Sequence, residues 1–152
     1  MPVRLAAMSD VAGIAALVER YWEFEGIGGF DRPRIEAILT NLISAPELGA
    51  CWVADVDGRL CGYLAAVFML SLEHGGLMAE IDEVFVSPEL RSAGLGSLLV
   101  ATAERDLAER GLRRLQLQLA AGNERARLFY QRHGFRRRAG YELLDKPLRP
   151  DA

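Results

Sequence analysis

A turn that carries two glycines is the part of the sequence best suited to hold a ligand. Residues 84–86 form a strand-like run, and Gly94 and Gly96 follow where a helix should begin. The first N–H groups of a helix have no partners within it, and the helix dipole adds partial positive charge, so such a place can bind phosphate. Arg91 could supply a further charged donor. A tight strand-to-helix turn without any ligand would explain the same two glycines.

Two common phosphate-binding motifs do not fit this turn. A Walker loop requires Gly-Lys-Ser/Thr, whereas Gly96 is followed directly by Ser97. A dinucleotide fingerprint requires a third glycine where this chain has Leu99. The turn therefore indicates neither an ATP-binding loop of the Walker type nor a Rossmann-type dinucleotide site.

The glycine motif and a second pattern further along the chain together resemble two motifs of one protein superfamily. Residues 91–96, Arg-Ser-Ala-Gly-Leu-Gly, resemble the acetyl-CoA signature Arg/Gln-x-x-Gly-x-Gly/Ala of the GNAT superfamily of N-acetyltransferases. The superfamily's second motif, Asn-x-x-Ala-x-x-x-Tyr followed by Gly-Phe, is matched by Asn123, Ala126, Tyr130, Gly134 and Phe135. The two motifs stand in the right order, and the resemblance extends over nearly the whole chain.

The resemblance implies acetyl-CoA as the cofactor, with CoA as the product. In the superfamily the fourth and fifth strands splay apart, and the pantetheine arm lies between them against the backbone of the fourth. Here that backbone would belong to Val84, Phe85 and Val86, which would accept the cofactor as a partial strand. Asn123 would bond the pantetheine arm. The pyrophosphate would lie on the turn formed by Arg91, Ser92, Ala93, Gly94, Leu95, Gly96 and Ser97.

Amide formation from a thioester requires a neutral amine, a donor for the tetrahedral oxyanion and a proton for the departing thiolate. The resemblance assigns the proton to Tyr130, which would also contact the cofactor, and the oxyanion donor to a backbone N–H near Val84. By its position alone, Tyr130 is more typical of an aromatic core residue with a bonded hydroxyl. The match to the second motif favours the catalytic acid.

The candidate general bases are carboxylates on a strand that otherwise looks buried, Glu80, Asp82 and Glu83. Strand alternation places Glu80 and Asp82 on one face and Glu83 on the other, unless a bulge intervenes. Glu80 lies where some histone acetyltransferases of the superfamily keep a glutamate, and Asp82-Glu83 resembles the acidic pair of polyamine-type relatives. The sequence does not favour either Glu80 or Glu83 over the other as the general base. Ordered water as the base, or carboxylates that merely face solvent, would fit the same pattern.

The acceptor would lie, by the same resemblance, beside the segment between the first two helices. That segment contains Tyr21, Trp22, Glu23, Phe24 and Glu25, which suit a cationic amine with some apolar body. A homodimer contact would explain the aromatic cluster equally well. We expect direct transfer to the amine in a ternary complex. The alternatives are a CoA-binding sensor or assembly module without turnover, and a phosphate-binding regulatory domain unrelated to CoA.

The elements that position these residues begin with strand-like residues 3–6, after which Ser9 or Asp10 can cap a helix. Residues 22–30 are predicted to form a loop because of their glycines, and Asp31 then caps a second helix. The remaining predicted elements are strands at 50–55, 60–71 and 78–86, a helix at 96–110, a strand at 115–119, a helix at 123–134, and one or two closing strands within 135–148.

This order predicts a mixed α/β protein, with an antiparallel first half and two strands made parallel by the helical crossover. The resemblance implies the GNAT fold, in which the sheet is mixed but mostly antiparallel, with splayed parallel central strands 4 and 5 and helices on both faces. We found no repeat or linker, so residues 1–152 are expected to form a single N-acetyltransferase domain.

Composition and charge exclude several classes of protein. The 152 residues, 51% hydrophobic and 26% charged, are typical of a folded domain, and the net charge of −3 gives no basic field for nucleic acid. Arg136 to Arg138 look like a solvated strand edge rather than a polyanion site.

No stretch reaches the ~20 apolar residues of a membrane span and no signal peptide is visible, so we expect a cytoplasmic protein. His74 and His133 lack metal-site partners, so no metal is expected.

The two cysteines flank a predicted hairpin turn at residues 57–58. In the simplest register, with Val56 opposite Arg59, Cys61 faces Ala54 and Cys51 faces Leu64. The thiols then lie on opposite faces of the sheet, too far apart for a disulfide. Both cysteines are expected to be small buried apolar residues.

Overall fold

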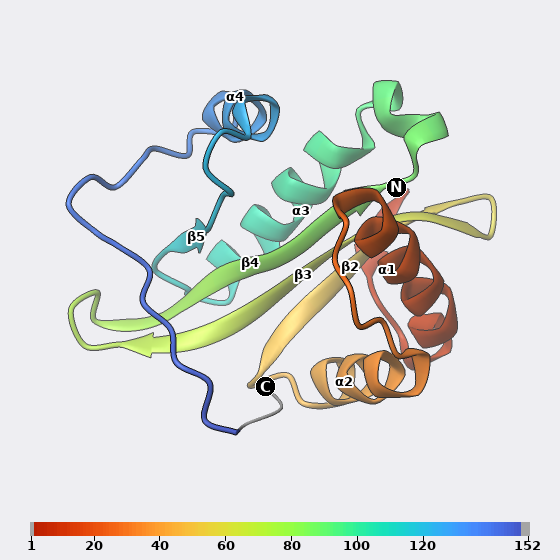
Figure 1. Ribbon diagram of the computed structural model, residues 1–152, viewed down its shortest axis with the longest axis horizontal. Coiled ribbons are helices and arrows are strands. Elements are labelled where there is room, and N and C mark those ends of the chain that lie inside the picture. Colours follow the sequence, from red (N-terminus) through yellow and green to blue (C-terminus); the bar gives the residue numbers. More distant parts are fainter. Residues whose placement is uncertain (1, 150–152) are drawn as a thin grey trace.

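The computed structural model describes residues 2–149, with the side chain of Ser92 outside the described part. Strands, helices and two short 3-10 segments alternate along this range (Figure 1). In order they are β1 (Val3–Leu5), η1 (Met8–Asp10), α1 (Val11–Glu25), α2 (Arg32–Ser44), β2 (Gly49–Val56), β3 (Arg59–Ser71), β4 (Gly76–Val86), η2 (Pro88–Ala93), α3 (Leu95–Glu109), β5 (Leu115–Leu117) and α4 (Glu124–Arg132).

The strands form one sheet in the order β1-β2-β3-β4-β5, and all neighbours are antiparallel except β4 and β5, which are parallel. Short turns join β2, β3 and β4, whereas the helical crossover through α3 makes β5 parallel to β4. Helices α1 and α2 cover one face, and α3 and α4 lie on the other (Figure 1). The predicted mixed sheet with helices on both faces is confirmed.

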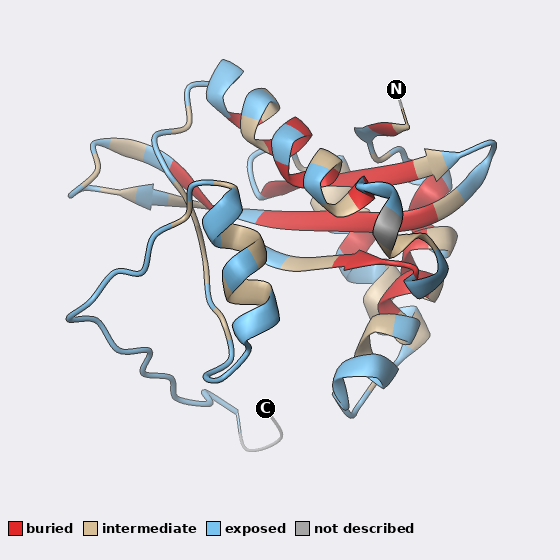
Figure 2. Ribbon diagram, turned by 90° about the horizontal axis from the view of Figure 1, so that it is seen from above, coloured by how far each residue is buried: buried red, intermediate tan, exposed pale blue. Residues whose placement is uncertain are grey.

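The centre of the sheet is buried on both faces, as Figure 2 shows for β2, β3 and β4. The α1 face is packed with side chains such as Ile14, Val53 and Phe85. The α3 face is packed with side chains such as Trp52 and Leu99, neither of which is exposed to solvent. Burial on two sides makes β4 a rigid support for the residues at its end.

A β-bulge changes the predicted register of the first hairpin. Val56 lies opposite Arg59, as predicted, but Ala54 pairs with Gly62 rather than with Cys61. Cys61 is the extra residue of the bulge, so every later pair in the hairpin is shifted by one position.

The shift also places Cys51 opposite Ala65 rather than opposite Leu64. Cys51 nevertheless belongs to the α1-face core and Cys61 to the α3-face core, so the predicted placement on opposite faces is confirmed. Both thiols are buried and unlinked, and burial raises the pKa of Cys51 to about 12.

Helix α1 is longer than predicted: it includes residues 22–25, which were expected to lie in a loop. The helix continues through Glu25 and ends at Gly26, whose φ is +73°. Tyr21 and Trp22 pack against the α1-face core, and this tertiary contact outweighs the turn preference of the neighbouring glycines. Asp31 caps α2, as predicted, by accepting a hydrogen bond from the Arg34 N–H at 3.3 Å.

The closing strands predicted within residues 135–148 are wrong. This segment has no regular structure and runs along the outside of the molecule (Figure 2). Leu143, Leu144 and Leu148 are 73%, 86% and 91% exposed, so the segment buries no inner face as a strand would. β5 is only three residues long, shorter than the predicted 115–119, and offers little edge for another strand to pair with.

Candidate active site

β4 loses its neighbour on one side halfway along its length. Only Ala79, Glu80 and Ile81 pair with β5. Over residues 82–86, β4 has no partner strand on this side within the described chain, and the backbone after β5 leads away toward α4 (Figure 1). Backbone N–H and C=O groups need hydrogen-bond partners, so this splay offers a place where an extended ligand can pair.

The predicted phosphate turn connects the end of β4 to α3. Gly94 follows η2 with a φ of +77°, a conformation that favours glycine, and α3 begins at the next residue. The hydrogen bond from the Leu98 N–H to the Gly94 carbonyl, at 3.1 Å, closes the first turn of the helix. The N–H groups of Gly96 and Ser97 therefore have no carbonyl partner within the helix and can serve an anion.

Helix α4 brings the second motif close to the first. The Asn123 side chain accepts a hydrogen bond from the Ala126 N–H at 3.2 Å, and so caps the start of α4. At its other end, His133 Nε2 lies 3.0 Å from the Ser97 hydroxyl in the first turn of α3. The two motifs recognised in the sequence thus belong to adjoining helices.

Tyr130 projects from α4 into an aromatic group. Its ring meets Phe129 and Phe135 edge-on, with centroid distances of 5.1 and 5.5 Å. Burial, together with the nearby Tyr21, raises the pKa of Tyr130 to about 12. Because its pKa is raised, the Tyr130 hydroxyl carries a proton at neutral pH. Within residues 2–149 no hydrogen bond to another side chain involves this hydroxyl, so the proton is available for donation.

Glu83 is held by two aromatic side chains that donate hydrogen bonds to it. Trp22 Nε1 donates a hydrogen bond to one oxygen at 2.9 Å, and the Tyr63 hydroxyl donates to the other at 2.7 Å. Burial raises the pKa of Glu83 above its usual value, Asp82 adds to that rise, and the two hydrogen bonds oppose it. A carboxyl whose pKa moves toward neutrality is better matched to general base catalysis.

A bulge in β4 overturns the predicted faces of the acidic residues. Residues 65–66 of β3 pair with Glu83 and Ile81, which leaves Asp82 as the extra residue. Ile81 belongs to the α3-face core, so its neighbour Glu80 points to the α1 face. Glu83, which bonds Trp22, points to that face too. Glu80 therefore shares a face with Glu83, which regular alternation would have placed on the other face.

Glu80 is held from β5 rather than from α1. Gln116 Nε2 donates to it at 2.9 Å, and Gln118 Nε2 lies 3.3 Å from both carboxylate oxygens. Asp82 is exposed, yet partial loss of hydration and the nearby Glu80 raise its pKa. Of the two bases predicted from the sequence, only Glu83 is bonded to the helix that bears the predicted acceptor aromatics.

The side chain of Arg91 engages the α1 side of the molecule. Its Nε donates to the Val86 carbonyl at 3.1 Å. The central carbon of the guanidinium lies 4.5 Å from the ring centroid of Phe24 and 5.6 Å from that of Phe85. The backbone of Arg91 belongs to the turn, while its charged group lies against the end of α1.

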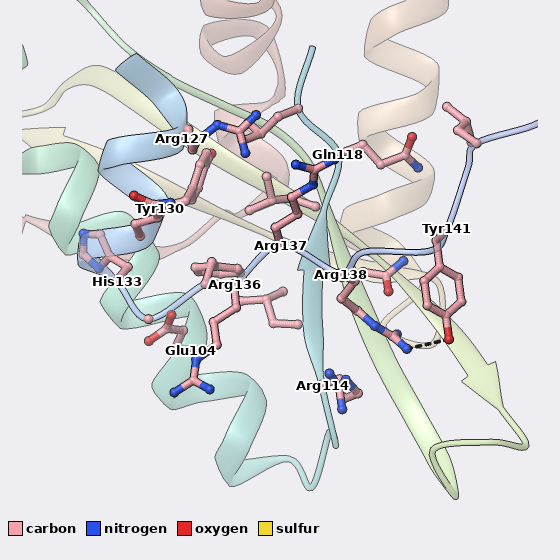
Figure 3. A pocket seen from close by; sticks show the side chains of 18 of the residues that line it. Glu104, Arg114, Gln118, Arg127, Tyr130, His133, Arg136, Arg137, Arg138 and Tyr141 are labelled. Atoms are coloured by element: carbon pink, nitrogen blue, oxygen red, sulfur yellow. Dashed lines mark hydrogen bonds between the residues drawn. The ribbon is translucent and has the colours of Figure 1, made fainter. Parts of the chain in front are cut away.

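A hollow of about 870 Å³ lies beside Tyr130, between α3, β5, α4 and the segment that follows. Arg136 and Arg138 contribute to its lining, but Figure 3 shows that they leave the chain in different directions. Arg136 extends toward Glu104 on α3, whereas Arg138 donates to the Tyr141 hydroxyl at 3.0 Å. These two arginines therefore do not converge on one point.

Within residues 2–149, no group of His, Cys, Asp and Glu side chains is arranged to hold a metal ion. None of the helices in that range is both long and apolar enough to cross a membrane.

Sequence reasoning missed the two hydrogen-bond donors to Glu83. Trp22 was singled out only as part of an aromatic segment, and Tyr63 was not singled out at all. In β3, Tyr63 stands opposite Phe85, close to Glu83. This neighbourhood depends on a register that contains a bulge, so spacing along the sequence could not reveal it.

The chain matches the model of the "Acetyltransferase (GNAT) family" over residues 14–135. It is 28% identical over 141 residues to the uncharacterized N-acetyltransferase YhfO of Bacillus subtilis (strain 168), which covers 93% of each chain. An integron cassette protein from a salt-marsh metagenome has a TM-score of 0.86 at 27% identity, covering 98% of this chain and 91% of its own. An aminoglycoside N-acetyltransferase solved in complex with CoA shares the fold, with a TM-score of 0.81 at 19% identity and coverage of 95% and 93%. Because the family match spans most of its length, the protein is a member of the GNAT family of acetyltransferases.

Proposed function

We propose that this protein transfers the acetyl group of acetyl-CoA to a primary amine, of a small molecule or a peptide, by direct attack in a ternary complex. The observation that carries the proposal is the unpaired edge of β4 over residues 82–86. This edge begins next to Glu83 and ends next to the turn that leads into α3. A cofactor laid along it would have its phosphates at the helix start and its thioester near Glu83 and Tyr130.

The cofactor would be held mainly by backbone groups. Residues 91–97 would contact the pyrophosphate through the N–H groups of η2 and the first turn of α3. Val84, Phe85 and Val86 would pair with the pantetheine arm, although the Val86 carbonyl already accepts from Arg91. Asn123 would contribute its amide group, whose oxygen also caps α4.

The acid and the base would act from opposite sides of the splay. Glu83 lies on the α1 face, and Tyr130 comes from α4 on the α3 face. The amine would lose a proton to Glu83, directly or through water, and its nitrogen would attack the thioester carbonyl carbon. A C–N bond forms, the C–S bond breaks, and Tyr130 gives its proton to the departing CoA sulfur. The N–H of Val84 would stabilise the oxyanion.

The surroundings of Glu83 support a cationic acceptor with an apolar body. Tyr21 and Trp22 form an aromatic wall on α1, and Phe30 packs edge-on against Trp22 at 5.8 Å. Burial raises the pKa of Tyr21, and the carboxylates of Glu25, Glu83 and Asp82 raise it further, which indicates negative charge around its hydroxyl. Such a wall favours an ammonium group. Its proton must then leave before the attack, which a nearby carboxylate can assist.

A thermal-shift panel of acetyl-CoA, CoA, ATP and NAD tests the cofactor assignment. A ligand at 100 times its Kd adds about 2.7 kcal/mol to the free energy of unfolding. We expect acetyl-CoA and CoA to raise the Tm and ATP and NAD to leave it unchanged. A screen of primary amines for release of the CoA thiol then tests turnover. A shift with NAD and none with CoA would contradict the proposal, and CoA binding without turnover on any amine would favour the sensor alternative.

A further inference from the structure

Arg91 is the only charged residue within the turn of residues 91–97, yet its side chain is committed elsewhere. Its Nε bonds the last carbonyl of β4, and its guanidinium stacks on Phe24 at 4.5 Å. Phe24 lies in the last turn of α1 and is 60% exposed. A flat guanidinium over an aromatic face is a favourable contact.

A second arginine connects the same two elements in the opposite direction. Arg20 of α1 donates to the buried hydroxyl of Ser87 at 3.1 Å and to Glu89 of η2 at 3.2 Å. Arg20 anchors the middle of α1 to the residues just before the turn, whereas Arg91 reaches from the turn to the end of the helix. The turn and the second half of α1 are thus joined at two points.

The end of α1 also bears on the proposed acceptor site. Trp22, two residues before Phe24, donates to Glu83 at 2.9 Å. The cofactor turn is therefore connected through Arg91, Phe24 and the last turn of α1 to Trp22, which bonds the carboxylate. A shift of the turn on binding a phosphate would be transmitted to the residues that face the amine.

We propose that Arg91 is a positioning residue whose guanidinium couples the cofactor turn to the end of α1. Through this coupling, CoA binding orders the aromatic wall of Tyr21 and Trp22, here called the acceptor wall. The Arg91 side chain acts through Phe24 and not as a ligand of the pyrophosphate, which the backbone N–H groups hold. This inference rests on the proposed function, since it requires CoA at the turn. By linkage, an acceptor that binds the ordered wall must tighten CoA by the same factor.

The test is amide hydrogen exchange over residues 20–27, with and without CoA, in the wild type and in Arg91→Lys. Lysine keeps the positive charge but lacks the flat group that stacks on a ring. In the wild type we expect CoA to slow exchange at the end of α1 by about 10-fold, within the usual range of coupling between sites. In Arg91→Lys the slowing should fall below about 3-fold, while the Kd for CoA measured by calorimetry changes by less than about 3-fold.

Two further variants sharpen the result. Phe24→Leu should abolish the same protection without touching the turn. Arg59→Gln is the matched control, because Arg59 also holds Glu89, at 3.2 Å, but is not part of the contact to Phe24; its protection should equal that of the wild type. The proposal is overturned by a wild type without protection at α1, by protection that persists in Arg91→Lys, or by a loss of CoA affinity of about 10-fold or more in that variant. A wild type that does not bind CoA would instead refute the proposed function.

Discussion

The two sides of the splay between β4 and β5 are built in different ways. On the α1 side, Glu83 is fixed by two hydrogen bonds, from Trp22 and Tyr63. On the α4 side, Tyr130 is fixed by ring contacts with Phe129 and Phe135, and its hydroxyl makes no side-chain hydrogen bond within residues 2–149. Hydrogen bonds tune the pKa of the group they hold, whereas ring packing orients a group and leaves its polar atom available. On the α1 side, the base side, activity should therefore fall when a single hydrogen-bond donor to Glu83 is removed. On the α4 side, the acid side, activity should fall only when the Tyr130 hydroxyl itself is removed.

The largest effect on cofactor binding is expected at Gly96, in the turn proposed to hold the pyrophosphate. A Cβ there would lie 3.6 Å from two carbons of Phe129, an ordinary contact, and its backbone does not require glycine, so Gly96→Glu should fold. Unit charges 4 Å apart repel by about 4 kcal/mol at an effective dielectric of 20, or about 1,000-fold in Kd. Calorimetry with CoA measures the loss. Gly96→Ala is the control, and it should bind much more tightly than Gly96→Glu. Equal CoA affinity in wild type and Gly96→Glu would mean that the phosphates lie elsewhere.

Glu83→Gln tests the base side. The amide keeps the size of the side chain but cannot take a proton, so kcat should fall by roughly 10²–10⁴-fold, with CoA binding unchanged. The substitution should also change how the free energy of unfolding depends on pH. Because the folded pKa of Glu83 is raised, the wild type loses stability as pH rises through that pKa, and the Glu83→Gln substitution removes this loss. Urea unfolding on both sides of that pH should therefore show a flatter pH dependence in the variant. Glu80→Gln is the matched control, and a larger kcat loss there would transfer the role of base to Glu80.

Tyr130→Phe tests the acid side, with an expected fall in kcat of about 10²-fold, near the lower end for acid–base catalysis, because water can partly replace the proton donor. The ring contacts survive, so the Tm and the Kd for CoA should stay near wild-type values. The loss should also shrink with an acyl donor whose leaving thiol has a lower pKa. Wild-type turnover by Tyr130→Phe on a verified acceptor would show that the tyrosine only packs.

The sequence predicted the elements that local patterns define, and it failed where long-range pairing decides. The glycine turn, the cap at Asn123 and the crossover helix each have a signature within a few residues. The bulge at Asp82 has none, because it exists only relative to β3, and so the faces of Glu80 and Glu83 were assigned wrongly. The prediction of closing strands within residues 135–148 was wrong for the same reason: a strand-like pattern does not show whether a partner edge is available for pairing. The site itself stays a prediction on both sides of the splay.

Trp22→Phe should have a smaller effect, because it removes one of the two donors to Glu83 and keeps the aromatic wall. The Trp22 hydrogen bond lowers the pKa of Glu83, so its loss should raise that pKa further. The acidic limb of kcat/KM against pH should then move to higher pH, and the rate at neutral pH should fall by only about 3–10-fold, the equivalent of one hydrogen bond. A pH profile that keeps its position while the rate falls would indicate that Trp22 serves the acceptor and not the base.

The smallest effect is expected in the segment beyond α4, and it tests whether the packing of Tyr130 depends on that segment. Leu144 is 86% exposed, so Leu144→Ser removes little buried apolar surface and should change the free energy of unfolding by no more than about 0.5 kcal/mol. Leu99→Ala, at a fully buried position beneath the same face, should cost about 2–5 kcal/mol and serves as the contrast. Chemical denaturation measures both. A cost above about 2 kcal/mol for Leu144→Ser would mean that the segment is covered in solution, for instance by pairing with the edge of β5, and that the acid side is held by more than its aromatic rings.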